Sequence, residues 1–257
     1  MESRWEGNVE RRETARGTAP VGIYLQPIAS PWSLGALGFG IATFIIGARI
    51  AGWYGVQGSQ VLLFPFALVL GGLLQLLAST WAFRARDMLA TVVFGVWGSF
   101  WLAYGLQYWL FATGVVPAPV DIGLSTAYGM LFFALAAVTL SCTIAALAEN
   151  IALTAMLGLL TIASILAGIA EVAASTGLLN AAGWGFVLSA LAAYYFASSL
   201  LISSSFNRML LPLGAGIVRH EEAPEDIDDG VGEPGVIRHP HADVPYRDRG
   251  RTAVGGR

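Results

Sequence analysis

The sequence predicts an all-α, polytopic membrane protein built as a six-transmembrane-helix bundle. Hydrophobic residues make up 56% of the 257 residues and charged residues only 12%, and the mean hydropathy is +0.65. A soluble domain usually carries about 25% charged residues, because water must solvate its surface. The charges also crowd the two ends of the chain, within residues 1–20 and 219–257. The middle is therefore apolar enough to face lipid on all sides.

Six apolar runs follow one another through this middle region. A helix needs roughly 20 apolar residues to cross a hydrocarbon core of ~30 Å. Glycine and other small residues interrupt each run, and membrane helices use such residues for close packing. The predicted spans cover residues 33–53, 61–82, 89–111, 123–147, 151–174 and 181–202. The rest of the chain is too short to bury six such runs, which excludes a soluble fold.

Individual spans have their own local support. The first follows Pro31, which loses no needed hydrogen bond at a helix start. Charged residues mark two junctions, with Arg84 and Arg86 between the second and third spans and Glu149 between the fourth and fifth. The fourth contains the only cysteine, Cys142, so no disulfide or cysteine-based metal site is expected. The sixth carries small residues suited to close helix packing, within or between protomers: Gly183, Gly185 and Ser189.

The distribution of arginine predicts the orientation in the membrane. All 14 basic residues are arginines. Those outside the spans include Arg4, Arg11, Arg12, Arg16, Arg84, Arg86, Arg208 and Arg219. The loops around 54–60, 112–122 and 175–180 carry none. The positive-inside rule then predicts that both termini lie in the cytoplasm, and an even number of spans agrees with termini on the same side. We expect a multi-pass protein of the plasma membrane.

The two ends of the chain lack the apolar pattern of the middle. We expect a cytoplasmic N-terminal tail over residues 1–28 and a cytoplasmic C-terminal tail over 216–257, both mostly disordered, around a transmembrane domain at 29–215. No secretory signal is expected, since about thirty polar residues precede the first apolar run. Three histidines in the C-terminal tail are interpreted as solvated residues rather than a metal site: His220, His239 and His241.

Several short blocks, in order along the chain, carry a resemblance to a known family. Before and within the first span stand Ser30-Pro31-Trp32-Ser33-Leu34-Gly35 and Gly38-Phe39-Gly40. The second and third spans contain Gly71-Gly72-Leu73-Leu74-Gln75 and Trp97-Gly98-Ser99-Phe100-Trp101-Leu102. The last blocks are Ala182-Gly183-Trp184 and Phe206-Asn207-Arg208-Met209-Leu210-Leu211-Pro212-Leu213-Gly214. Over about residues 29–215 the chain resembles the acetate uptake transporter family of the YaaH/SatP type.

This resemblance implies a six-helix protomer with its own pore, assembled as a homo-hexamer. It also implies passage of small carboxylates such as acetate or succinate, with proton coupling in some members. Four positions depart from the family pattern: Ser30 and Ser33 replace an asparagine and a proline, Trp97 a tyrosine, and Ala82 an acidic residue. The substrate therefore stays open, and the alternative is a channel for urea, short amides or another small neutral solute.

The resemblance also places the narrow point of the pore. The phenylalanine, tyrosine and leucine that form it in the family fall on Phe39, Trp97 and Leu160. A pore for small carboxylates needs an apolar neck to exclude hydrated ions, and a few donors to replace lost water. Aromatic and leucine side chains in membrane helices also pack or face lipid, so that alternative remains for each residue.

Polar and charged side chains within the spans are the other candidates for the pathway. Gln75 could donate to a carboxylate or tie two helices together, and Ser99 and Thr161 could bond to their own backbone instead. Arg49 and Glu171 lie near the outer ends of the first and fifth spans. They could form an outer vestibule, where Arg49 attracts the anion and Glu171 senses pH, or they could snorkel to the interface.

The sequence gives no support for an enzyme or a cofactor. The spans contain no histidine and no paired carboxylates at helical spacing. Without lysine, a phosphate-binding Gly-Lys-Ser/Thr loop is impossible, and without a basic face nucleic-acid binding is excluded. We predict a transporter or channel. A membrane scaffold without flux would fit the topology but would leave the matched blocks unexplained.

Overall fold

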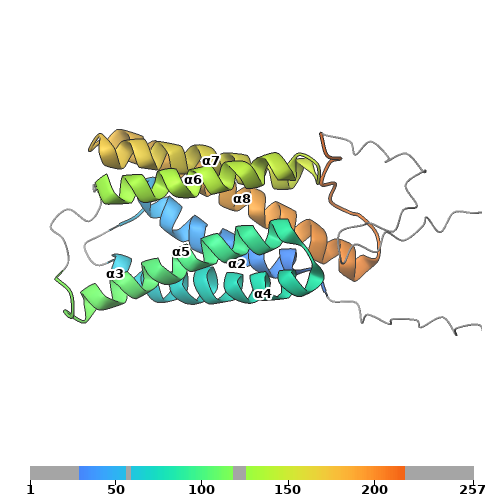
Figure 1. Cartoon of the computed structure of the whole chain (residues 1–257), viewed down its shortest axis with the longest axis horizontal. Helices are drawn as coiled ribbons and strands as arrows, with labels where there is room; N and C mark the ends of the chain where they lie inside the picture. Colours follow the sequence, from blue (N-terminus) through green and yellow to red (C-terminus); the bar gives the residue numbers. More distant parts are fainter. Residues whose placement is uncertain (1–28, 56–58, 118–125, 218–257) are drawn as a thin grey trace, which may run out of the picture. The chain divides into compact units, whose positions relative to one another are not determined.

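The computed structural model describes residues 29–55, 59–117 and 126–217. In these ranges six helical segments are long and apolar enough to cross a membrane, and no strand is present, which confirms the predicted all-α class. The segments are α2 (Pro31–Ile50), the continuous run of α3 (Ser59–Phe66), η1 (Ala67–Leu73) and α4 (Leu74–Ala85), α5 (Met88–Ala112), α6 (Thr126–Ala146), α7 (Ile151–Val172) and α8 (Thr176–Phe206). Figure 1 shows them as long, roughly parallel rods.

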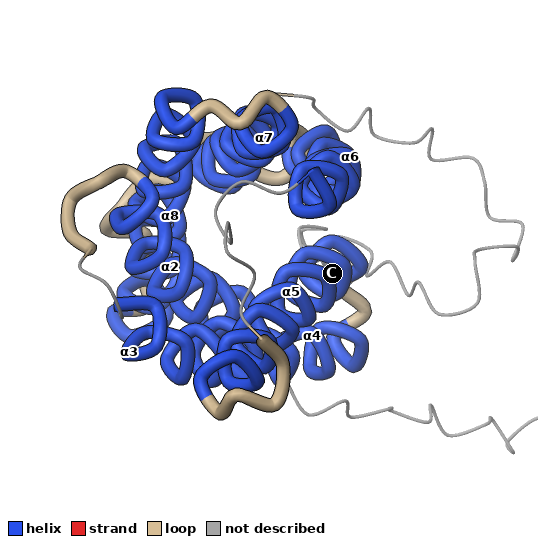
Figure 2. The backbone as a smooth tube through the Cα atoms, turned by 90° about the vertical axis from the view of Figure 1, so that its left-hand side faces the viewer, coloured by secondary structure: helices blue, strands red, loops and turns tan. Residues whose placement is uncertain are grey.

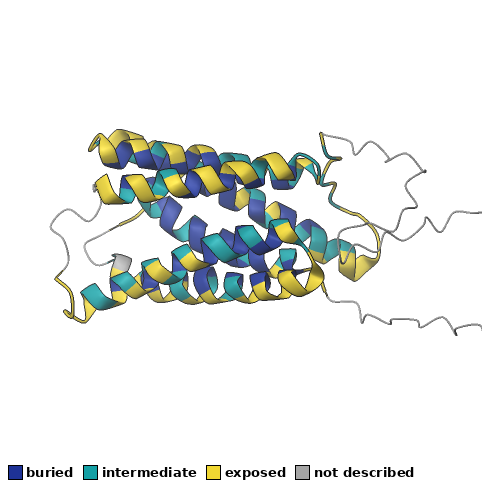
Figure 3. Cartoon of the chain, in the orientation of Figure 1, coloured by how far each residue is buried: buried dark blue, intermediate teal, exposed yellow. Residues whose placement is uncertain are grey.

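The helices surround a common interior (Figure 2). Going round the bundle, α6 packs on α7, α7 on α8, α8 on α2, and α2 on η1 and α4, which pack on α5. The seam between α5 and α6 closes the circuit and has the sparsest packing. Buried residues face this interior and exposed apolar residues cover the outside (Figure 3). A bundle that exposes Leu62, Phe83 and Ile144 on its outer faces suits lipid rather than water.

Polar residues at the helix starts set several boundaries. The Asp87 carboxylate accepts a hydrogen bond from Ala90 N at 2.9 Å and another from Trp32 Nε1 at 2.6 Å, so it caps α5 and ties it to the start of α2. Asn150 caps α7 through Leu153 N at 2.9 Å. Such caps satisfy amide groups that have no partner in the first helical turn.

The predicted boundaries differ from the structure mainly in the first and last spans. The first helix ends at Ile50 rather than 53, and Gly52 then adopts a positive φ of 78°. The last helix starts at Thr176 rather than 181 and runs on to Phe206 rather than 202. The interpretation of 175–180 as a loop is wrong, because the Ser175 hydroxyl caps a helix that begins directly after it.

The second span contains a π-helical stretch, η1, that the apolar pattern does not predict. Pro65 lies just before it and cannot donate an intrahelical hydrogen bond, which disturbs the regular ladder. Gly71 lies within it at a close helix contact. A Cβ on Gly71 would come within 2.6 Å of Ala42 Cβ and 2.7 Å of Trp101 Cγ. Glycine therefore allows η1 to lie directly against both α2 and α5.

The small residues of the last span mediate packing within the protomer. A Cβ on Gly183 would lie 2.3 Å from the N of Ala51, which directly follows α2, and one on Gly185 would lie 2.9 Å from Ala163 Cβ on α7. The Ser189 hydroxyl donates to the Met156 carbonyl of α7 at 2.8 Å. The longest helix is thus fixed between its two neighbours.

A short segment after α8 folds back over one end of the bundle. This C-terminal strap, residues 207–217, accepts hydrogen bonds at Pro212 O from Tyr195 Oη (2.6 Å) and at Leu213 O from Ala152 N (3.0 Å). Ile217 N donates to Leu147 O at 2.8 Å, so the first two residues of the predicted C-terminal tail are ordered against the bundle. The rest of both predicted tails, with the three histidines, lies outside the described residues.

Candidate functional site

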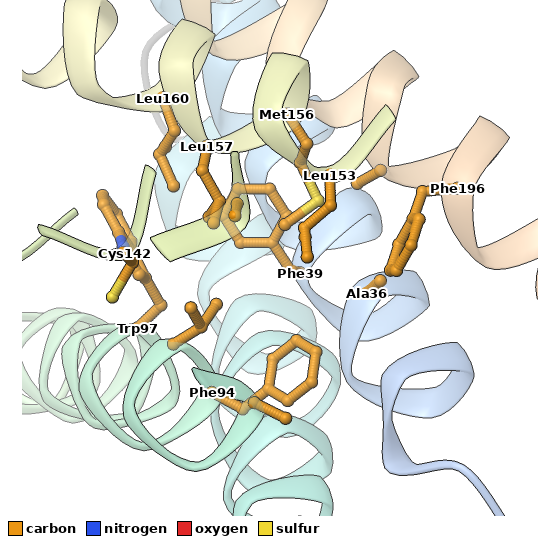
Figure 4. Close-up of a cluster of buried hydrophobic side chains, with 14 of the residues drawn as sticks. Ala36, Phe39, Phe94, Trp97, Cys142, Leu153, Met156, Leu157, Leu160 and Phe196 are labelled. Carbon is orange, nitrogen blue, oxygen red and sulfur yellow. The ribbon is translucent and has the colours of Figure 1, made fainter. Parts of the chain in front are cut away.

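The three residues predicted to form the neck come together in the interior. Phe39, Trp97 and Leu160 are 0%, 2% and 0% exposed and belong to one buried cluster. The Phe39 and Trp97 rings meet edge to face, with centroids 6.0 Å apart. Figure 4 shows Leu160 and Leu157 of α7 pointing toward these two rings. The three come from α2, α5 and α7, so side chains from three separate helices meet where the neck is predicted.

Trp97 is fixed by more than its packing. Its Nε1 donates to the Thr139 hydroxyl on α6 at 3.1 Å, and that hydroxyl donates to Leu135 O at 2.7 Å. The ring also contacts Phe100, with centroids 5.4 Å apart. The tryptophan that replaces the family tyrosine therefore has its one polar atom satisfied, while its ring meets that of Phe39 edge to face.

A cavity of about 100 Å³ lies on one side of this neck. A single water needs only ~10–15 Å³, so the cavity has room for several waters or a small solute. Trp97 forms its floor, and residues from α2, α5, α6, α7 and α8 line its walls. Enclosure by five helices places the cavity inside the bundle rather than on its surface.

Arg49 and Glu171 both line this cavity, which brings together the two charged residues predicted for the outer vestibule. Glu171 is only 7% exposed, so it is not a snorkelling side chain. Arg49 shares this cavity with Tyr104 and Tyr108 of α5. Arg49 also influences Tyr54, which lies outside the span. Partial burial raises the pKa of Tyr54, and the positive charge of Arg49 opposes that shift.

Aromatic residues of α5 form one wall of the cavity. Trp97, Trp101, Tyr104 and Tyr108 all line it. The Tyr104 and Tyr108 rings have centroids 4.6 Å apart, and those of Trp101 and Tyr104 are 5.7 Å apart. Sequence reasoning missed the last three of these residues. The successive steps of four, three and four residues from Trp97 to Tyr108, which keep all four on one face of a helix, were the signal that could have found them.

The predicted polar candidates separate into three different environments. Gln75 is fully buried, and neither of its amide atoms has a hydrogen-bond partner. Thr161 donates to Leu157 O at 2.9 Å and lies 3.1 Å from the Thr143 hydroxyl, so it ties α7 to α6. Ser99 is exposed and donates to Gly95 O at 2.7 Å. The structure therefore does not bring Ser99 to the cavity.

Two further sites have simple accounts. Glu149 is exposed in the turn before Asn150, in agreement with its interpretation as a solvated junction residue. Ala82 is fully buried in the core cluster. An acidic side chain there would need a partner, and alanine removes that need. Within the described ranges, no group of three His, Cys, Asp or Glu side chains could hold a metal ion.

Six membrane-crossing helices around a solute-sized cavity that ends at a buried apolar cluster define a multi-pass membrane protein. The chain belongs to the GPR1/FUN34/yaaH family, whose sequence model matches residues 17–213. This confirms the acetate transporter family that the ordered blocks predicted.

The chain is also similar to individual proteins and to a solved structure. The chain is 41% identical over 73 residues to an uncharacterized protein of Methanothermobacter thermautotrophicus (28% of this chain, 34% of that protein). It is 30% identical over 99 residues to ammonia transport outward protein 2 of Saccharomyces cerevisiae (37% and 35%). These matches span about a third of each relative's length. The fold is similar to that of the bacterial acetate channel SatP, with a TM-score of 0.67, 23% identity, and coverage of 73% of this chain and 100% of that one.

Proposed function

We propose that this protein carries small carboxylic acids or their anions, of the acetate and succinate type, through the interior of each protomer. The observation that carries the proposal is the arrangement of cavity and neck. Side chains from three separate helices close an apolar constriction directly beside a cavity that holds Arg49 and Glu171. Small carboxylates are proposed as the solutes because this chain belongs to the GPR1/FUN34/yaaH family and its fold is similar to that of the acetate channel SatP.

The geometry suggests a sequence of steps. Arg49 attracts the carboxylate to the cavity, whose aromatic wall covers the apolar part of the solute. Hydrated ions are excluded at the neck, because Phe39, Trp97 and Leu160 offer no groups that could replace their water. The neck is packed shut in this structure, so passage requires these side chains to move apart.

Orientation, assembly and coupling belong to the same proposal. Arg84, Arg86 and Arg208 lie at one end of the bundle and Arg49 near the other. Under the positive-inside rule this distribution supports our proposal that both termini are cytoplasmic and that the cavity faces the outside. Assembly as a homo-hexamer in the plasma membrane and coupling to protons follow from the family resemblance. Glu171, buried beside the cavity, is our candidate for the group that responds to protons.

Flux into liposomes tests this function directly. The purified full chain is reconstituted, and uptake of labelled acetate, succinate and urea is measured in parallel, with and without a pH gradient. Acetate uptake that rises with inward protons supports the proposal. Passage of urea without acetate contradicts it and favours the neutral-solute alternative. A Leu188→Ala variant, altered at a side chain that is 48% exposed on the outer face of α8, should transport acetate as the wild type does and so controls for reconstitution of altered protein.

A further inference from the structure

The interior on the side of the neck opposite the cavity is filled by apolar side chains. On α2, α5 and α7, every residue that lines the cavity is a neck residue or follows it in sequence. The buried side chains that precede the neck on α5 and α7, together with one from the second half of α8, fill the bundle in the other direction. They include Phe94, Leu153, Met156 and Phe196, each no more than 2% exposed.

Trp32, near the start of α2, joins two of these side chains in an aromatic layer. Its ring meets that of Phe94 from α5 and that of Phe196 from α8 edge to face, with centroid distances of 5.1 and 5.6 Å. Figure 4 shows Phe94 and Phe196 in the same buried cluster as Phe39. Trp32 precedes Phe39 by seven residues, which is about two helical turns or ~10 Å along the axis. We call Trp32, Phe94 and Phe196 the inner layer.

The three rings of the inner layer differ in their freedom to move. Phe94 is fully buried and packs on the backbone of α2, since a Cβ on Gly35 would come within 2.5 Å of its ring. Phe196 is 2% exposed within the core cluster. Trp32 is only half-buried, beside the first residue of its helix. It is therefore the ring that can leave the layer without displacing a helix.

A carboxylate fixes Trp32 in this position. The indole Nε1 donates to Asp87 Oδ2 at 2.6 Å, while the other carboxylate oxygen, Oδ1, accepts from Ala90 N at 2.9 Å. Hydrogen bonds to an ionised group are shorter and about twice as strong as those between neutral groups. The cap on α5 needs only one oxygen, so the second is available to hold the indole.

We propose that Trp32 is a second gate of the solute pathway, on the side of the neck opposite the cavity, and that Asp87 is the positioning residue that keeps it closed. This inference rests on the proposed function, because a carboxylic acid or its anion that has passed the neck meets the inner layer next.

Neck and gate then have separate effects on transport. The neck selects between solutes by size, whereas the Trp32 gate determines how often the far end of the pathway is open. Passage requires both to open, so flux rises with the fraction of protein in which the gate is open. Release of Trp32 therefore raises the flux and leaves the preference between solutes as it was.

Asp87→Asn breaks the bond to Trp32 and preserves the cap. Asparagine caps a helix about as well as aspartate, through its side-chain oxygen. With that oxygen bonded to Ala90 N, its amide nitrogen faces the Trp32 Nε1, and two donors form no hydrogen bond. Trp32→Phe breaks the same bond from the other partner and retains an aromatic ring in the inner layer.

Liposome flux of the full chain measures the effect of these two variants. We expect each to raise acetate flux per folded protein about threefold to tenfold, the equilibrium effect of one hydrogen bond. The flux of benzoate relative to acetate should keep its wild-type value, because the neck is intact. A residue that served only the fold would not raise the flux when it is replaced.

The double variant Asp87→Asn with Trp32→Phe shows whether both residues act through one bond. Once either substitution has broken the bond, the other should add nothing, so the double variant should match each single variant. Effects that multiply would mean that the two residues act separately, and would refute the role of Asp87.

Asn150→Asp is the matched control. Asn150 caps α7 through Leu153 N at 2.9 Å, and the starts of α5 and α7 lie at the same end of the bundle (Figure 1). The substitution exchanges the same two groups in reverse and should leave acetate flux unchanged. A change as large as that in Asp87→Asn would mean that flux responds to charge at this end of the bundle, and would refute the gate.

Two further results would overturn the gate. Wild-type flux in both folded single variants would mean that the bond between Trp32 and Asp87 does not limit passage. Lower flux together with a lower thermal midpoint would mean that this bond only fastens α2 to α5. Absence of acetate flux in the wild type would instead refute the proposed function, so the two failures are distinguishable.

Discussion

Replacement of Trp97 by alanine is the most direct test of the neck. The indole is 2% exposed and packs between Phe39 and Phe100 at centroid distances of 6.0 and 5.4 Å. Removing it takes away most of one wall of the constriction. We expect the neck to widen and bulkier carboxylates to pass.

The magnitude follows from packing. A buried tryptophan replaced by alanine costs about 3–5 kcal/mol in the free energy of unfolding. Selection by an apolar pocket against a slightly larger solute is worth about 1–3 kcal/mol, or roughly tenfold or more in rate. The flux of benzoate relative to acetate should therefore rise about tenfold in Trp97→Ala, in liposomes that contain equal amounts of folded protein.

Two variants make this result interpretable. Trp97→Tyr restores the aromatic residue of the family and should keep the wild-type preference. Trp109→Ala removes another tryptophan of the same helix, one that is 49% exposed, and should alter neither the flux ratio nor, by more than a small amount, the stability. If folded Trp97→Ala keeps the wild-type ratio, the assignment of the neck is refuted.

Three further outcomes are expected. Arg49→Gln should raise the apparent KM for acetate several-fold, because the cavity loses its positive charge; an unaltered KM in the liposome assay would exclude that role. Gly183→Ala should lower the free energy of unfolding by about 1–3 kcal/mol, seen as a lower thermal midpoint, because its new Cβ would lie 2.3 Å from Ala51 N. Gly177→Ala is the control, since its new Cβ would meet nothing within 4 Å. Ser99→Ala should leave acetate flux unchanged and alter the free energy of unfolding by no more than ~0.5 kcal/mol, because Ser99 is exposed. A clear loss of flux would mean that Ser99 does belong to the solute pathway.

Length and composition were enough to predict the membrane bundle, because crossing a hydrocarbon core imposes a minimum apolar length on every span. They could not predict the π-helical stretch over Ala67–Leu73, since an apolar run reads the same whatever its hydrogen-bond register. Nor did they find the start of the last helix at Thr176. That boundary depends on a cap from Ser175 rather than on hydropathy.

The interior was harder to predict than the spans. Membrane helices are apolar on every side, so periodicity does not separate the face that lines a cavity from the face that meets lipid. Phe39, Trp97 and Leu160 could be named only because short blocks resembled a family. Thr43 and Ser164 carry no such signal, and only the assembled bundle reveals that they are buried without partners.

The C-terminal strap determines where this chain can be shortened or fused to another protein. The Leu213 carbonyl accepts a hydrogen bond from the first-turn amide of Ala152 at the start of α7, and the Pro212 carbonyl accepts one from the hydroxyl of Tyr195. A truncation placed directly after Phe206 would leave these donors facing lipid headgroups and would uncover the core beneath Leu213. Tags, reporters or reconstitution anchors therefore belong beyond Ile217, which within the described residues makes the final backbone hydrogen bond to the bundle.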